Sequence, residues 1–150
     1  MKTKENIKDI SKSEIYKIKE LWEELNAIHH EDSVYFKDFY ETFSFGKRMK
    51  HLETFPDDDI KISVVETGGK IMGYCISSVN GSAGEIESLY LRESVRKMNY
   101  GRELVDLHKG WLQSKNCTKI KVTVSFGHDS VLKFYNKMGF FERKTELELK

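Results

Sequence analysis

The chain has 150 residues, of which 39% are hydrophobic and 33% charged, with a formal net charge of +1. This length fits one domain over residues 1–150 and suffices for a hydrophobic core without disulfides or structural metals. The near-neutral charge gives no general attraction to nucleic acid or to an anionic membrane, and no apolar run is long enough to cross a bilayer, so we expect neither as a partner.

The cysteines, the histidines and the N-terminus exclude several further classes of protein. Cys75 and Cys117 are too few for a disulfide framework and show no CxxC spacing, which predicts free thiols in a reducing cytoplasm. The five histidines show no metal-ligand spacing, so we expect no metal site. Residues 1–10 are charged and lack the apolar stretch of a signal peptide.

The first part of the chain is predicted to hold a short strand and two helices. Residues 6–10 can form the strand, and Ser11 and Glu14 then have the spacing of a capping box. Apolar residues at helical intervals predict a first helix to about residue 28, and a second helix follows residue 33. The second helix carries an aromatic stripe of Phe36, Phe39, Tyr40 and Phe43. We interpret this stripe as core packing, with a wall of a substrate pocket as the alternative.

After Pro56 the pattern changes to strands and two further helices. Residues 60–66 alternate in polarity and are β-branched, and residues 71–79 form the returning strand after a turn at Gly68 and Gly69, which predicts a hairpin. Further strands are predicted at residues 85–91, 117–126 and 139–149, and apolar stripes predict helices from about residue 99 and over residues 131–138. The predicted order is β-α-α-β-β-β-α-β-α-β, an α/β (α+β) fold with helices on both faces of a mixed sheet whose last crossovers are right-handed and join parallel neighbours.

A polar turn over residues 96–101 precedes the first of these late helices. A helix that begins near Asn99 leaves its first N–H groups without partners inside the helix. A phosphate placed there accepts these hydrogen bonds and meets the positive end of the helix dipole, and Arg96, Lys97 and Arg102 add positive charge. A charged surface turn capped by Asn99 is the alternative, and the turn alone does not decide between the two.

Two linked motifs resemble the GNAT superfamily of acyl-CoA-dependent N-acetyltransferases. The run Arg96-Lys97-Met98-Asn99-Tyr100-Gly101 is similar to the family's Q/R-x-x-G-x-G/A pattern, and residues 128–140 (HDSVLKFYNKMGF) are similar to N-x-x-A-x-x-x-Y-x-K-x-G-F. The similarity extends over about residues 60–145 and, more loosely, the two leading helices. Asn99 replaces the first family glycine, and asparagine tolerates a left-handed backbone better than most residues. His128 replaces the common asparagine, which weakens its inferred contact with the cofactor.

The resemblance implies a mostly antiparallel sheet of about six to seven strands and a site for acetyl-CoA. The backbone of the central strand would pair with the pantetheine arm, and the turn would hold the diphosphate. The implied cofactor-binding residues are Leu89, Tyr90 and Leu91 on the strand, Arg96, Lys97, Met98, Asn99, Tyr100, Gly101 and Arg102 at the turn, and His128.

The resemblance also suggests the residues that move protons. Tyr135 matches the family's general acid, although a core tyrosine is the alternative. Glu85 matches a strand glutamate that serves some members as the base, and Glu87 is its neighbour. Strand alternation predicts that both glutamates share one face and point away from Ile86 and Ser88. A surface salt-bridge ladder is the alternative for the glutamates.

Together these features predict an N-acetyltransferase that moves the acetyl group of acetyl-CoA to a primary amine by direct transfer within a ternary complex. The acceptor would be a small amine or an amino group of a larger molecule, with Trp22, His29 and Tyr35 as candidates for its pocket. A CoA-binding sensor or inactive relative is one alternative, and a module for protein contacts is another. A homodimer is possible, because many members of the family are dimers.

Overall fold

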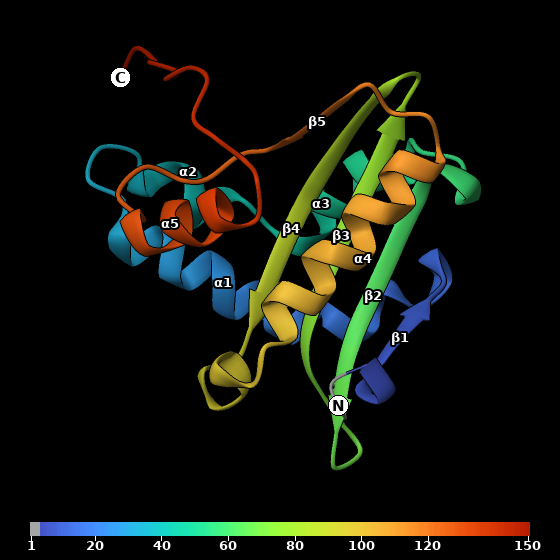
Figure 1. Cartoon of the computed structure of the whole chain (residues 1–150). Helices are drawn as coiled ribbons and strands as arrows, with labels where there is room; N and C mark the ends of the chain where they lie inside the picture. Colours follow the sequence, from blue (N-terminus) through green and yellow to red (C-terminus); the bar gives the residue numbers. More distant parts are fainter. Residues whose placement is uncertain (1–3) are drawn as a thin grey trace.

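A five-stranded sheet runs through the structure, a computed structural model that describes residues 4–150 (Figure 1). The strands, in spatial order, are β1 (Ile7–Ile10), β2 (Ile60–Thr67), β3 (Lys70–Asn80), β4 (Ala83–Leu91) and β5 (Lys119–Val122). The first four pair in antiparallel fashion, and β5 pairs parallel to β4. The mixed, mostly antiparallel sheet is confirmed, with five strands in place of the six to seven that were expected.

The strand predicted over residues 139–149 is wrong. Residues 140–150 form neither strand nor helix, and Leu147 and Leu149 are 91% and 97% exposed. Alternation of apolar and charged residues favours a strand only where a neighbouring edge supplies hydrogen bonds, and this segment pairs with none of the five strands. The predicted strand over residues 117–126 is also shorter, because β5 ends at Val122.

Helices cover both faces of the sheet, as predicted (Figure 1). They are α1 (Lys19–Asp32), α2 (Lys37–Thr42), α3 (Phe45–Glu53), α4 (Tyr100–Ser114) and α5 (Asp129–Lys137), with 3-10 turns at Lys4–Asn6, Lys12–Ile18, Asp57–Asp59 and Glu93–Met98. The predicted capping box of Ser11 and Glu14 is present. The second predicted helix divides in two, because the chain extends at Phe43 and Ser44 then caps α3 by accepting from the Lys47 amide at 3.2 Å.

Each face of the sheet packs its own core. On one face, Leu21 of α1 and Leu52 of α3 are buried against β2, β3 and β4. On the other, Leu104 of α4 and Tyr135 of α5 are buried with Ile86 of β4. Only part of the aromatic stripe lies in the core. Phe43 packs against the first core, whereas Phe39 on α2 is 53% exposed. None of the described helices has both the length and the apolarity to span a membrane.

Candidate active site

Strands β4 and β5 separate halfway along β4. Ala83 to Ile86 pair with Lys119 to Val122 of β5, and β5 then ends. From Glu87 to Leu91, the β5-facing edge of β4 has no partner strand within residues 4–150. The backbone of this stretch can therefore pair with an extended ligand, except that the Glu87 carbonyl already accepts from Arg48 and the Leu91 carbonyl from Arg96.

A β-bulge lies where the strands separate. Ser77 of β3 pairs with Ile86 and Ile76 pairs with Ser88, so Glu87 is an extra residue in β4. The expectation that Ser88 points away from Glu87 is wrong, because a bulge interrupts strand alternation. The Ser88 hydroxyl lies 2.8 Å from the Tyr74 hydroxyl, on the face that also holds Glu87.

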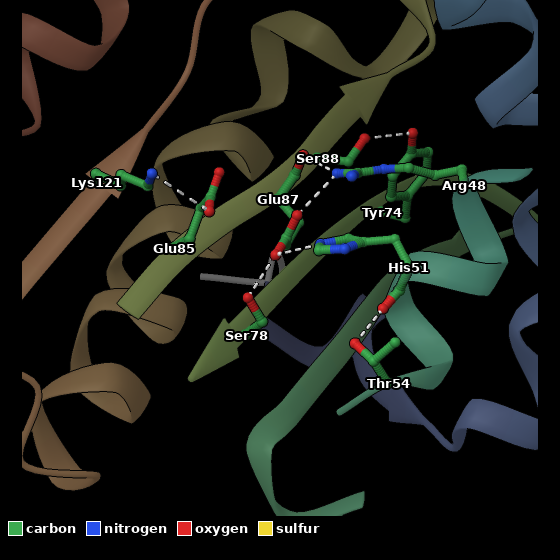
Figure 2. Close-up of polar contacts among 9 residues, drawn as sticks. All are labelled: Arg48, His51, Thr54, Tyr74, Ser78, Glu85, Glu87, Ser88 and Lys121. Atoms are coloured by element: carbon green, nitrogen blue, oxygen red, sulfur yellow. Dashed lines mark hydrogen bonds and ion pairs between the residues drawn. The ribbon is translucent and has the colours of Figure 1, made fainter. Parts of the chain in front are cut away.

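Polar side chains from α3 and β3 surround the Glu87 carboxylate (Figure 2). The Glu87 side chain is 3% exposed. Arg48 Nη2 donates to Oε1 at 3.0 Å and to the Glu87 backbone carbonyl at 2.7 Å. Ser78 Oγ donates to Oε2 at 2.5 Å, and His51 Nε2 lies 3.4 Å from the same oxygen. These contacts hold the carboxylate in one orientation.

Glu85 has a different environment on the same face (Figure 2). Its side chain is 30% exposed, and Lys121 Nζ, itself well exposed, lies 3.9 Å away. Burial and the nearby charge of Glu87 raise the pKa of the Glu85 carboxyl. Within residues 4–150 it accepts no hydrogen bond from another side chain, so its lone pairs are available for a proton.

Tyr135 lies in the second core, on the buried side of α5. It is 5% exposed and makes edge contacts with the rings of Phe134 and Phe140 at 5.1 and 5.7 Å. Burial raises the pKa of its phenol. No described residue hydrogen-bonds with the hydroxyl, although a buried tyrosine O–H normally has a partner. Within residues 4–150 this hydroxyl therefore keeps its capacity to hydrogen-bond with a ligand.

The turn before α4 has the predicted backbone. Asn99 takes the left-handed conformation, with φ 72° and ψ 8°, and no side chain caps the helix that follows. The first N–H groups of α4 therefore keep their hydrogen-bonding capacity for an anion. Gly101 serves packing as well, because a Cβ at this position would lie 3.4 Å from the Phe134 ring.

Positive charge surrounds this turn. Lys97 and Arg102 are exposed and form no ion pair within residues 4–150, and Arg96 Nε donates to the Leu91 carbonyl at 2.8 Å. Met98 is 54% exposed beside them. The Tyr100 side chain is buried and its hydroxyl accepts from Asn6 at 2.7 Å, so this residue offers only its backbone to a ligand. The donors, the open backbone and the charge fit a diphosphate.

Two histidines meet where α1 faces the start of α5. The rings of His29 and His128 lie 5.3 Å apart, and His128 Nε2 is 3.2 Å from an Asp32 carboxylate oxygen. Burial, followed by the charge of His128, lowers the pKa of His29 to about 4. His128 is therefore engaged by α1, and its predicted contact with the cofactor would need this pair to open.

The other two candidates for the acceptor pocket lie apart. Trp22 is 5% exposed and packs edge-on against Phe43 and Phe45, at 5.5 and 5.8 Å, so the structure places it in the core and not on a pocket wall. Tyr35 is 58% exposed between α1 and α2 and stacks on Phe126 at 6.5 Å.

Sequence reasoning missed Arg48, the main partner of Glu87. A signal for it exists: Phe45, Met49 and Leu52 form the buried face of α3, and Arg48 lies on that same face. A cation on a buried helix face needs an anionic partner, and Glu87 supplies it. No group of three or more histidine, cysteine or acidic residues in the described range is arranged to hold a metal ion.

Comparison with solved structures places this fold among the acetyltransferases. A PaiA N-acetyltransferase from Thermoplasma acidophilum, in complex with coenzyme A, has a TM-score of 0.76 and 17% identity, covering 93% of this chain and 91% of that one. The aminoglycoside N-acetyltransferase AAC(6')-Iy, in complex with CoA, has a TM-score of 0.68 and 14% identity, covering 96% and 97%. At these identities the likeness concerns the fold.

The sequence comparisons show the family. An uncharacterized N-acetyltransferase of Methanocaldococcus jannaschii is 29% identical over 82 residues. That match covers 54% of this chain and 53% of the relative, so the chain spans about half the length of the relative it matches. The family model described as "Acetyltransferase (GNAT) family" matches residues 17–140. The chain therefore belongs to the GNAT acetyltransferase family, whose acyl donor is acetyl-CoA.

Proposed function

We propose that this chain transfers the acetyl group of acetyl-CoA to a primary amine, directly, within a ternary complex. The observation that carries the proposal is the open edge of β4 beside an uncapped, positively charged helix N-terminus. The backbone from Leu89 to Leu91 would pair with the pantetheine arm as an added strand would. The amides from Asn99 to Arg102 would bind the diphosphate, assisted by the side chains of Arg96 and Lys97.

Proton transfer is the main task of the protein side chains. An amine with a pKa near 10.4 is neutral in only about one molecule in 2,500 at pH 7, so a base accelerates the reaction. A β4 carboxylate, Glu85 or Glu87, would take a proton from the ammonium group and free its lone pair. Bound acetyl-CoA supplies the activated carbonyl. As the nitrogen–carbon bond forms and the carbon–sulfur bond breaks, Tyr135 would give its hydroxyl proton to the departing sulfur and regain one from the new amide nitrogen. The balance is one proton released to solvent.

The proposed acceptor is defined by its chemical class. We propose a small amine, or an amino group on a larger molecule, that approaches over α1 and α2 near His29 and Tyr35. One structural neighbour, an aminoglycoside acetyltransferase from an uncultured soil metagenomic sample, was solved in complex with sisomicin, an observation that concerns that protein (TM-score 0.63, 16% identity, covering 96% of this chain and 93% of that one). We also propose that residues 1–150 act as one domain, in the cytoplasm, and that a homodimer is the form to test by sedimentation.

Thiol release across a panel of amines tests the function. We expect free CoA thiol to appear in step with acetylated amine for at least one amine class, with mass spectrometry identifying the product. Binding of CoA without thiol release for any amine would favour the CoA-binding sensor. Failure to bind CoA at all would favour a module for protein contacts.

A further inference from the structure

Glu85 and Glu87 share one face of β4 but differ in what holds them (Figure 2). Glu87 accepts hydrogen bonds on both carboxylate oxygens and is 3% exposed. Glu85 is 30% exposed, and within residues 4–150 its carboxylate forms one ion pair, with Lys121 Nζ at 3.9 Å. A general base must reach its substrate and keep a free lone pair. Only Glu85 of the two meets both conditions.

Arg48 causes this difference. One of its nitrogens, Nη2, reaches both the side chain and the backbone carbonyl of Glu87, at 3.0 and 2.7 Å. These two contacts from one rigid group keep the Glu87 side chain oriented toward Arg48 on α3. The guanidinium stays charged at any working pH, and with 19% exposure its pairing with Glu87 is only weakly screened.

We propose that Arg48 is a positioning residue that divides the roles of the two glutamates: it holds the Glu87 side chain in place and leaves Glu85 as the base. This inference rests on the proposed transferase function. The Glu85 carboxylate takes one proton from the acceptor ammonium, the freed nitrogen attacks the thioester, and Glu85 then returns its proton to solvent. Burial and the nearby charge of Glu87 raise the pKa of the Glu85 carboxyl, which favours proton uptake by Glu85.

The charges that face Glu85 come from three elements. Glu87 on β4 raises the pKa of Glu85, whereas Lys121 on β5, and Arg48 and His51 on α3, lower it. The inference therefore predicts opposite effects of two substitutions. Arg48→Gln removes a positive charge and should raise the pH at which the Glu85–Glu87 pair takes up its first proton. Glu87→Gln removes a negative charge and should lower the pH at which Glu85 titrates.

The test is a carbon-13 NMR titration of the glutamate carboxyl groups in the protein alone, matched by pH profiles of kcat/KM. Arg48→Gln and Glu87→Gln should move both the titration and the acidic limb of the profile, in opposite directions. Glu85→Gln should lower kcat/KM by roughly 100-fold or more, and Arg48→Gln by roughly tenfold. Arg48→Lys, which keeps the charge, should restore the titration toward wild type.

Lys61→Gln is the matched control, because Lys61 is 16% exposed and pairs with Asp9 on β1, away from the cleft. It should move neither titration nor profile. If Arg48→Gln does not fold, Glu87→Gln still tests the inference through its own shift. Two shifts in the same direction, or a loss of activity in Glu87→Gln that Glu85→Gln does not show, would overturn it.

The titration also separates this inference from the proposed function, since it needs neither acetyl-CoA nor an amine. Opposite shifts of the glutamate titration in a protein without transferase activity would support the role of Arg48 and reject the transferase function. An active enzyme whose glutamates do not shift would reject the role of Arg48 and keep the transferase.

Discussion

At the scale of single residues, Tyr135 combines burial with a hydroxyl that no described residue engages. Tyr135→Phe removes this oxygen and keeps the ring contacts with Phe134 and Phe140. If the hydroxyl protonates the departing sulfur, kcat should fall by about 10²–10³-fold while the affinity for CoA changes little. Steady-state kinetics and calorimetric titration with CoA measure the two quantities.

Tyr74→Phe is the control for this substitution, because Tyr74 is also buried but its hydroxyl is bonded to Ser88. Its loss should cost about 1 kcal/mol of stability and change kcat only a few-fold. An unchanged kcat in Tyr135→Phe would contradict the role of Tyr135 as the acid and favour the alternative that it is only a core residue.

Asn99 carries the backbone of the diphosphate turn, with φ 72°. Asn99→Gly should leave the free energy of unfolding and the CoA affinity nearly unchanged, because glycine adopts this conformation freely. Asn99→Val should cost about 1–2 kcal/mol of stability and weaken CoA binding, because a β-branched residue is strained there. Asn116→Val is the matched control.

Asn116 has φ 64° just after α4, at the end far from the turn. Its substitution should cost similar stability but spare CoA binding, as measured by denaturant unfolding and calorimetry. If both valine variants bind CoA equally well, the turn does not hold the cofactor.

The sequence anticipated residues whose role is local and missed those whose role depends on a partner strand or helix. The left-handed Asn99 follows from a motif of adjacent residues. The Glu87 bulge depends instead on the register between β3 and β4, which no pattern within β4 records. The pairing of Arg48 with Glu87 joins residues 39 positions apart.

At the scale of elements, α4 shows what an apolar stripe leaves out. Its helical spacing was predicted, yet the buried face also contains His108, which is fully buried. Ser63 Oγ donates to Asp9 at 2.6 Å, so it accepts from His108 Nε2 at 2.9 Å. His108 Nδ1 is then left to accept from Ser77 Oγ at 2.7 Å. This network joins α4 to β1, β2 and β3 through a neutral imidazole.

The network predicts how stability depends on pH. Burial lowers the pKa of His108 to about 3, below its usual value of 6.5. The stabilisation is complete above pH 6.5 and declines as pH falls toward 3, because the unfolded state binds a proton that the folded state does not. Between pH 6.5 and 5 the loss should be about 1–2 kcal/mol. Denaturant unfolding of wild type and His108→Gln checks this: the variant should lose less stability over that interval, and equal slopes would contradict it.

The segment after α5 has a local pattern that predicts an element the structure does not form. Residues 139–149 have a strand pattern, but a strand requires pairing with a neighbour, and this segment pairs with no strand of the described chain. By contrast, the stop at the end of α5 was predicted correctly, because Gly139, with φ 96°, needs only its own turn.

At the scale of the whole molecule, the proposed cofactor site draws on three elements that also pack together in the second core. It takes backbone from β4, amides from α4 and a hydroxyl from α5. A ligand that bridges three elements stabilises the folded state by mass action, because the unfolded chain lacks the site. At 100 times its Kd, CoA should add about 2.7 kcal/mol. For a domain of this size, that corresponds to a rise in Tm of about 5–10 °C.

Thermal unfolding with CoA and with pantetheine separates the two halves of the site. Pantetheine lacks the diphosphate and should raise Tm much less at equal concentration, since it leaves the α4 amides and their neighbouring cations without an anion. Added salt should reduce the CoA effect more than the pantetheine effect, because the exposed charges of Lys97 and Arg102 are screened. Equal Tm shifts for the two ligands would place the binding energy on the β4 edge alone. The absence of any Tm shift with saturating CoA would remove the basis for the transferase, because every step proposed for Glu85 and Tyr135 requires the thioester to be held beside β4.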